Sequence, residues 1–398
     1  MKYVLVVFDG MADDPARVPG GKTPIMLSDC ANLREMARKG TVGIVKTAPD
    51  GMTPGSDITN MGILGYAPDK YYRGRAAIEA AALGIPMSEG DTAYRVNLVT
   101  QEHGIMADSA ADHISDGEAR ELIEALNGAF ACGDYRFYPG VSYRHIMVLR
   151  HGSMNVTLYP PYKFVGEPLA DHMPQGDFAG LFASLIRRSV PLLEQHPVNK
   201  KRVAEGKRPA NCIWFWAEGM QTELDLFSSK YGMKGAVIAG VDLIKGLGRL
   251  AGLDVPDVEG ATGYIDTSYE NKARAAMEAL ADHGFVFVHV EAPDEAGHER
   301  NLTEKVKAIE SIDRVIVGGI RRYLKEAGED YRMLLMPDHP TPVSTGSHSS
   351  EPVPFVMYDS RMDTKSNAEY DELSALASPV RLGAASGLMD VLLEKRSF

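Results

Sequence analysis

The sequence has few cysteines and no dense block of positive charge. Only three of its 398 residues are cysteine, and Cys30, Cys132 and Cys212 are scattered without forming a CxxC pair. This usage argues against a disulfide framework and favours a reducing, cytoplasmic location. The formal net charge is −12, and the lysines and arginines do not gather in one run. A nucleic-acid or anionic-membrane partner is therefore not expected.

Long apolar runs and nucleotide-binding glycine loops are also missing. No run reaches the roughly 20 residues of a membrane span, and the first one, residues 2–8, is too short for a signal peptide. There is no Walker A motif and no kinase-type glycine loop. With 398 residues, 44% of them hydrophobic, the chain is expected to be soluble and to form two domains.

Three short apolar runs are each followed closely by an aspartate. Residues 3–8 precede Asp9, residues 285–290 precede Asp294, and residues 331–336 precede Asp338. Near-continuous apolar runs are typical of parallel strands that are covered on both faces. Because the carboxyl ends of parallel strands share one edge of a sheet, these aspartates are expected to meet in one crevice.

The rest of the pattern predicts an α/β fold with an inserted α+β domain. We expect residues 1–92 and 261–398 to form the parallel-sheet domain and residues 93–260 to form the insertion. Within the insertion, residues 93–100 alternate like a half-exposed strand, and residues 196–209 look like a polar, basic loop. Trp214 and Trp216 share one strand face and are interpreted as core packing. Residues 303–325 predict one long amphipathic helix.

Histidines and a serine accompany the three aspartates. His298 follows Asp294 by four residues, so both side chains share one face if the segment is helical. Adding His339, His348 and Ser56 gives too many ligands for one tetrahedral ion and about the right number for two. Each residue also has a structural alternative: Asp338 could cap a turn, and Ser56 could cap the helix that it opens rather than act as a nucleophile.

Taken together, the motifs resemble the alkaline phosphatase superfamily, and within it the archaeal type of cofactor-independent phosphoglycerate mutase. The resemblance rests on residues 9–10, 54–56, 293–298, 338–339 and 348, and extends through residues 72–75, 140–145 and 261–267. The chain is also similar to a bacterial offshoot proposed as homoserine kinases, notably at residues 196–199 and 352–355. The likeness covers nearly the whole chain and implies an alkaline-phosphatase-like parallel sheet flanked by helices.

The resemblance also implies roles for the site residues. Asp294, His298 and His348 would hold one divalent ion, and Asp9, Ser56, Asp338 and His339 would hold a second. Mn²⁺ is expected because hard oxygen ligands are numerous, although Zn²⁺, Co²⁺ and Mg²⁺ suit the same ligands. Ser56 would carry the phosphoryl group between the 3- and 2-positions of glycerate, and the inserted domain would close over this small phosphorylated substrate. The implied substrate contacts are His113, Arg95, Arg144, Lys245 and Arg75.

Several features leave the substrate open. The chain departs from the mutase pattern at Asp112, at Tyr162 and Lys163, and at Glu218, all in the predicted insertion. Among the implied substrate contacts, Arg95, Arg144 and Lys245 could instead be solvated or paired charges. Arg75 could contact only the backbone, and His113 could be an ordinary turn residue. The alternatives are a phosphotransferase on a small hydroxy amino acid such as homoserine, a metal-dependent phosphatase or sulfatase, and a metal-stabilised binding protein without turnover.

Overall fold

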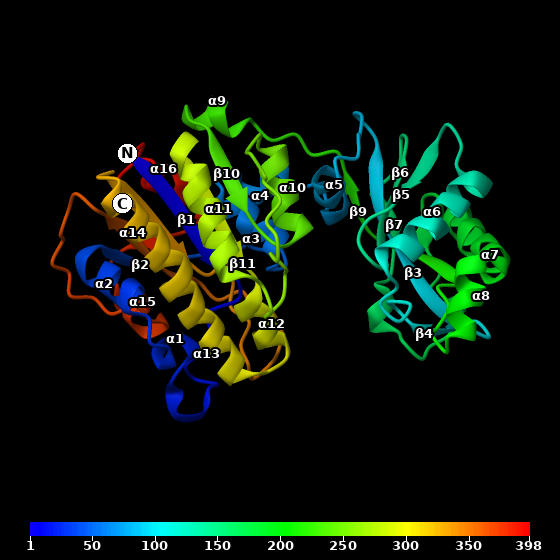
Figure 1. The fold of residues 1–398 in the computed structure, drawn as a ribbon, viewed down its shortest axis with the longest axis horizontal. Helices are drawn as coiled ribbons and strands as arrows, with labels where there is room; N and C mark the ends of the chain where they lie inside the picture. Colours follow the sequence, from blue (N-terminus) through cyan, green and yellow to red (C-terminus); the bar gives the residue numbers. More distant parts are fainter. The chain divides into compact units, whose positions relative to one another are not determined.

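Strand β1 (Lys2–Phe8) lies inside a seven-stranded sheet that unites both ends of the chain (Figure 1). The computed structural model describes residues 1–398, with the side chain of Pro19 outside the description. The sheet has the order β10-β11-β1-β12-β13-β2-β14, and only β13 runs antiparallel to its neighbours. Its other strands are β2 (Thr41–Val45), β10 (Gly235–Ile238), β11 (Phe285–Val290), β12 (Tyr331–Met336), β13 (Val353–Asp359) and β14 (Arg381–Leu382). The α/β prediction is confirmed, although the sheet is mixed rather than wholly parallel.

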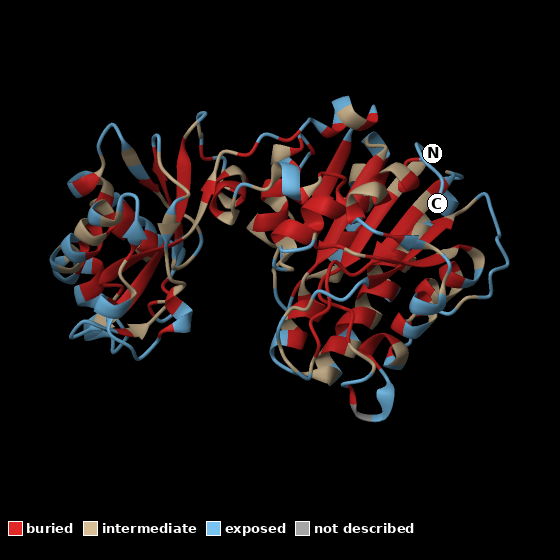
Figure 2. Ribbon diagram, turned by 180° about the vertical axis from the view of Figure 1, so that it is seen from behind, coloured by how far each residue is buried: buried red, intermediate tan, exposed pale blue. Residues whose placement is uncertain are grey.

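Helices cover both faces of this sheet, and its strands are almost entirely buried (Figure 2). They are α1 (Pro24–Leu27), α2 (Ala31–Lys39), α3 (Ser56–Ile63), α4 (Pro68–Tyr71), α9 (Phe227–Tyr231), α10 (Asp242–Leu250), α11 (Tyr269–Asp282), α12 (Ala292–His298), α13 (Leu302–Ser311), α14 (Gly318–Glu326), α15 (Glu372–Ala377) and α16 (Leu388–Leu392). Among the described residues, no helix is long and apolar enough to cross a membrane.

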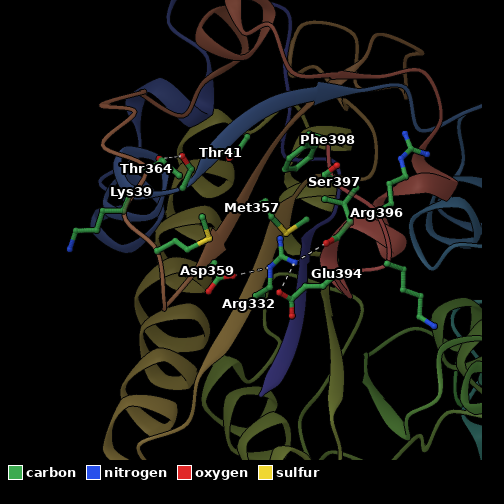
Figure 3. Close-up of a pocket in the computed structure, with 14 residues that line it drawn as sticks. Lys39, Thr41, Arg332, Met357, Asp359, Thr364, Glu394, Arg396, Ser397 and Phe398 are labelled. Carbon is green, nitrogen blue, oxygen red and sulfur yellow. Dashed lines mark hydrogen bonds and ion pairs between the residues drawn. The ribbon is translucent and has the colours of Figure 1, made fainter.

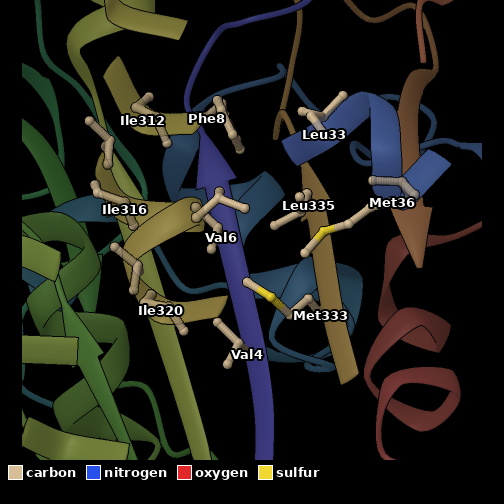
Figure 4. Packing of buried hydrophobic residues seen from close by; sticks show 14 of the residues in the cluster. Val4, Val6, Phe8, Leu33, Met36, Ile312, Ile316, Ile320, Met333 and Leu335 are labelled. Carbon is tan, nitrogen blue, oxygen red and sulfur yellow. The ribbon is translucent and has the colours of Figure 1, made fainter. Parts of the chain in front are cut away.

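The core shows how strand and helix periodicities fit together (Figure 4). Alternate β1 residues, Val4, Val6 and Phe8, are fully buried in the same cluster as Ile312, Ile316 and Ile320. The period of two on the strand and of four on the helix brings each set onto one face. Burying a side chain of this size contributes about 1.5–3 kcal/mol, so this packing rigidly supports the strand that ends at Asp9.

The helix predicted over residues 303–325 forms, but not as one regular α-helix. A π-helical segment, Ile312–Val317, joins α13 to α14. Asp313 in this segment accepts hydrogen bonds from the backbone amides of Asn32 and Leu33, at 3.1 and 2.8 Å. It thereby satisfies the free N–H groups at the start of α2, a tertiary contact that the hydrophobic period does not encode.

Residues 73–222 form a second compact unit, and residues 1–72 with 223–398 form the first. We call these unit 2 and unit 1. The sequence placed the boundaries after residues 92 and 260 instead. The difference has two causes: β10 pairs with β11 and so draws residues 223–260 into unit 1, whereas α5 (Arg75–Ala82) packs on β3 and β9 and belongs to unit 2. Lys245, on α10, therefore lies in unit 1.

Unit 2 is an α+β body with a five-stranded sheet and a separate two-stranded sheet, whose strands all pair antiparallel. Its strands are β3 (Thr92–Glu102), β4 (Ile105–Asp108), β5 (Tyr135–Tyr138), β6 (Arg144–Leu149), β9 (Cys212–Met220) and the small pair β7 (Val156–Thr157) and β8 (Gln175–Gly176). Its other helices are α6 (Asp116–Phe130), α7 (Ala179–Gln195) and α8 (Pro197–Ala204). Trp214 and Trp216 are both buried, which agrees with the core interpretation.

Two local predictions in unit 2 were wrong. Strand β3 is buried along most of its length rather than half-exposed, because β6 and β9 pair with it on either side and α5 packs against it. Residues 197–204 form helix α8 rather than a loop. His196 caps this helix by accepting a hydrogen bond from the Val198 amide at 3.3 Å, and Pro197 occupies its first turn. Proline at this position favours a helix start rather than preventing one.

Candidate metal centre and phosphoryl-transfer site

The seven predicted ligand residues come together at one edge of the unit 1 sheet. Asp9 directly follows β1, and Asp338 and His339 follow β12. Asp294 and His298 lie on α12, so the predicted helical spacing is present. Ser56 begins α3, and His348 lies in the loop after His339. Asp9, Asp338 and His339 are fully buried and Asp294 is 3% exposed, so the sheet edge concentrates carboxylates in a poorly hydrated place.

Ser56 faces this cluster instead of capping its helix. Gly55 is the N-cap residue of α3, and no side chain caps that helix. The Ser56 hydroxyl donates to Asp9 Oδ2 at 3.3 Å and lies 3.3 Å from His339 Nε2. The capping alternative is therefore wrong. A half-buried hydroxyl at a helix N-terminus is well placed to receive an anionic group, because free amides and the helix dipole stabilise negative charge there.

One group of possible ligands comprises Asp294, His298 and His348. Asp294 lies 3.1 Å from His298 Nε2 and 3.4 Å from His348 Nε2. The Nδ1 atoms of both histidines face backbone carbonyls, those of Gly346 at 3.0 Å and Pro54 at 2.9 Å. If each Nδ1 carries the ring proton and donates it, each Nε2 is unprotonated. The two Nε2 atoms then face each other with their lone pairs, only 3.0 Å apart. Such a pair needs a proton or a metal ion between its members, and backbone-oriented imidazoles are typical of metal ligands.

The second group comprises Asp9, Asp338 and His339 beside Ser56. His339 Nε2 lies 3.3 Å from Asp9 Oδ1 and 3.5 Å from Asp338 Oδ2. Asp338 is held by Asn60 at 2.7 Å, by Thr59 at 3.2 Å and by the Gly10 amide. Asp9 Oδ1 is buried without a hydrogen-bond donor among the described residues. A buried carboxylate oxygen that accepts no hydrogen bond is a suitable ligand for a cation.

The pKa values reflect carboxylates that are buried close to one another. Burial, with Asp338 and Asp294 nearby, raises the pKa of Asp9 well above its usual value. Hydrogen bonding to Asp294 raises the pKa of His298 to about 9. Burial would lower the pKa of His348, but contact with Asp294 outweighs it and raises that pKa. A divalent cation would replace these protons, so the donor set, its charge and its burial all fit metal binding.

The structure adds neighbours that the sequence did not single out. His289, in β11, is fully buried with Nε2 3.1 Å from Asp9 Oδ2, and burial lowers its pKa to about 4. The sequence feature that could have identified it is a single histidine inside the apolar run 285–290. Thr341 donates its hydroxyl to Asp294. Asn60, four residues after Ser56, could have been found from helical spacing, because positions i and i+4 share one face of a helix.

The predicted substrate contacts divide between the two units. Arg75, Arg95, Arg144 and His113 lie in unit 2, and Lys245 lies in unit 1. Glu79 pairs with Arg75 at 3.0 Å and with the buried Arg95 at 2.9 Å. The Arg95 guanidinium also lies 4.0 Å from the centre of the Trp216 ring. Arg144 and His113 are exposed. Arg75 and Arg95 are thus both paired with Glu79, while Arg144 and His113 face solvent.

A separate groove of about 480 Å³ lies at the opposite, amino-terminal end of the unit 1 strands (Figure 3). Arg332 in this groove is 3.5 Å from Asp359 and 3.9 Å from Glu394. Its charge is already balanced by these two carboxylates, and the groove contains none of the predicted ligands. By contrast, a hollow of about 200 Å³ lies directly beside His348.

Buried Glu372 supports the segment that follows Asp9, and its titration predicts how stability depends on pH. It accepts hydrogen bonds from the Asp13 amide at 3.0 Å and the Thr23 hydroxyl at 2.7 Å. Burial raises its pKa to about 7, and Asp371 adds to the rise. An unfolded glutamate titrates near 4.3. Between about pH 4 and 7 the folded chain therefore binds a proton that the unfolded chain does not, and this group makes stability fall as pH rises.

When the pH rises from 4.5 to 8, the stability of the Glu372→Gln variant is therefore expected to increase by about 2–3 kcal/mol relative to that of the wild type. Urea unfolding at both pH values measures the difference. Glu369→Gln, which removes only an exposed pair with Arg38, is the matched control. An equal wild-type-to-variant difference at both pH values would contradict the assignment.

The fold and the site define an α/β protein with a buried Asp/His/Ser cluster at a sheet edge. The family model for 2,3-bisphosphoglycerate-independent phosphoglycerate mutase matches residues 37–199. A relative so named from Methanosarcina mazei is 45% identical over 99% of this chain and 100% of its own length. One from Methanothrix thermoacetophila is 47% identical over 94% and 95%. One from Geobacter sulfurreducens, named as a probable mutase, is 44% identical over 99% and 100%. The chain belongs to the 2,3-bisphosphoglycerate-independent phosphoglycerate mutase family.

Solved structures agree with this assignment. The cofactor-independent phosphoglycerate mutase from Thermoplasma acidophilum matches with a TM-score of 0.67 at 28% identity, covering 99% of this chain and 100% of that one. A protein from Pyrococcus horikoshii matches with a TM-score of 0.82 at 26% identity, covering 100% and 99%. The family prediction from the sequence is confirmed, and these relatives support the mutase rather than the kinase-like alternative.

Proposed function

We propose that the chain interconverts 3-phosphoglycerate and 2-phosphoglycerate through a phosphoserine at Ser56, without added bisphosphoglycerate. The observation that carries the proposal is the Ser56 hydroxyl, which lies 3.3 Å from both Asp9 and His339 and makes no capping bond. The mutase names of relatives that span the whole chain supply the substrate. The enzyme is accordingly an isomerase that transfers a phosphoryl group within one substrate skeleton.

In the proposed reaction, Ser56 Oγ forms a bond to phosphorus while the bond from phosphorus to the 3-oxygen breaks. The serine proton leaves and the released oxygen takes one up, so the products of this half are phosphoserine and glycerate. Glycerate then turns and its 2-hydroxyl takes the phosphoryl group back, which frees Ser56. The amino end of α3 stabilises the phosphoserine. Water must be kept out at this stage, since hydrolysis would release phosphate.

We further propose two divalent ions, expected to be Mn²⁺. Asp294, His298 and His348 would hold one, and Asp9, Ser56, Asp338 and His339 would hold the other. Bound ions of this kind lower the pKa of a coordinated hydroxyl and neutralise charge on a transferring phosphoryl group. Thr59 and Asn60 orient Asp338, and Thr341 orients Asp294. The three cysteines are free, and we propose a cytoplasmic location.

Phosphorus NMR tests the function directly. Protein reconstituted with Mn²⁺ is mixed with 3-phosphoglycerate and no bisphosphoglycerate. Appearance of the 2-phosphoglycerate resonance, and its loss on addition of a chelator, is the expected result. Release of free phosphate alone would replace the mutase with a phosphatase. No change in the spectrum would overturn the proposed substrate.

A further inference from the structure

Unit 2 contains a turn with an uncommon backbone conformation. Ala111, Asp112 and His113 have φ values of 46°, 53° and 47°, so three successive residues that are not glycine are left-handed. Each such residue costs roughly 1–2 kcal/mol. Runs of this kind persist only where the surrounding structure holds them, and they gather at functional sites. Asp112 and His113 are both exposed, and His113, which ends the run, is one of the residues expected to contact substrate.

Two side chains hold this turn from different elements. Asp108, at the end of β4, accepts hydrogen bonds from the Ala110 amide at 2.8 Å and the Asp112 amide at 2.9 Å. Arg202, on α8, donates to the Ala111 carbonyl at 2.8 Å. Arg202 is 2% exposed. Its other N–H groups donate to Glu118 at 2.9 Å and to the Arg208 carbonyl at 3.0 Å, which orients the guanidinium toward the turn.

The same turn is connected to Arg95 and Arg75, the two arginines that pair with Glu79. Asn97, on β3, donates to the Ser109 carbonyl at 3.1 Å and accepts from Trp216 Nε1 at 2.9 Å. Trp216 in turn packs against Arg95, whose other neighbour is Glu79. The left-handed turn, Arg95 and Arg75 are therefore linked by one hydrogen-bonded and stacked network.

We propose that Arg202 and Asp108 are positioning residues that hold the left-handed turn and thereby orient His113 toward the anionic substrate. The inference rests on the proposed function. Neither residue contacts substrate in this scheme. Arg202 holds the carbonyl side of the turn and Asp108 holds its amide side, so the orientation of the imidazole depends on both.

The test compares Asp108→Ala and Arg202→Lys with the wild type. Asp108 is partly exposed, so its replacement is compatible with folding, and lysine retains the charge at position 202. Both variants are expected to lower kcat/KM for 3-phosphoglycerate by about 10²-fold, the cost of a misplacement near 1 Å. They are also expected to increase deuterium uptake in the peptide that spans residues 109–114. This uptake is independent of catalysis, so a failed mutase assignment is distinguishable from a failed positioning role.

Two further comparisons separate positioning from stability. Adding Asp112→Gly to Asp108→Ala or to Arg202→Lys is expected to raise kcat/KM about tenfold, because glycine adopts positive φ readily. In a His113→Ala background, Asp108→Ala is expected to have no further effect, because the two changes act through the same group. Asn199→Ala removes buried α8 bonds to Leu193 and Ala210 without touching the turn, and should lower thermal stability alone. Full additivity with His113→Ala, or no rescue by glycine, would overturn the proposal.

Discussion

Ser56→Ala is expected to lower turnover by about 10⁴-fold or more, because removing a nucleophile disables the whole catalytic unit. When the variant is mixed with substrate and the reaction is rapidly quenched, the intact mass of the protein should show no covalently bound phosphoryl group. Its thermal stability should change little, since the Ser56 hydroxyl makes no capping bond. The phosphorus NMR assay measures the rate.

Ser268→Ala provides the matched control for this experiment. Ser268 is also in unit 1, but its hydroxyl caps α11 by accepting from the Asn271 amide at 3.2 Å. Loss of such a cap costs about 1 kcal/mol of stability and should leave turnover unchanged. The two serines are thus expected to show opposite patterns. Turnover of Ser56→Ala within tenfold of the wild type would remove Ser56 as the nucleophile.

His348→Ala is expected to reduce the bound divalent metal and to abolish turnover while the fold remains largely intact. His348 lies in a loop, and its side chain contacts Pro54, His298, Asp294 and the ring of His339. Wild-type protein should gain about 2.7 kcal/mol of stability when Mn²⁺ is present at 100 times its dissociation constant. The variant should gain less. Metal content by mass spectrometry and thermal unfolding with and without Mn²⁺ measure both effects.

His283→Ala is the control for loss of a histidine in unit 1. His283 pairs with Asp254 at 2.8 Å, away from the ligand cluster, and should change neither metal content nor turnover. Asp338 is a poorer choice for the primary test, because it also accepts bonds from Thr59, Asn60 and Gly10 that support the fold. A His348→Ala protein with full metal content and full activity would contradict the two-ion proposal.

Some site residues were predictable because local pattern and topology act together. An apolar run that ends in aspartate predicts both the strand and the edge where the carboxylate lies, which is why Asp9 and Asp338 were found. Asp294 and His298 followed from helical spacing. His289 was missed because its polar side chain is inside such a run, and only the pairing of β1 with β11 brings it to Asp9. Glu79 was missed although it lies four residues after Arg75 on α5, whereas its contact with Arg95 on β3 depends on tertiary packing.

The order and spacing of neighbouring residues were enough to predict the α/β class, the family and the seven residues that come together beyond β1 and β12. Only contacts between distant segments set the unit boundaries and the left-handed turn that ends at His113. These features depend on contacts between distant segments: β10 with β11, α5 with β9, and Arg202 with Ala111. Hydrogen bonds and packing formed across the fold can outweigh local preference by several kcal/mol, and the sequence pattern near a residue does not record them.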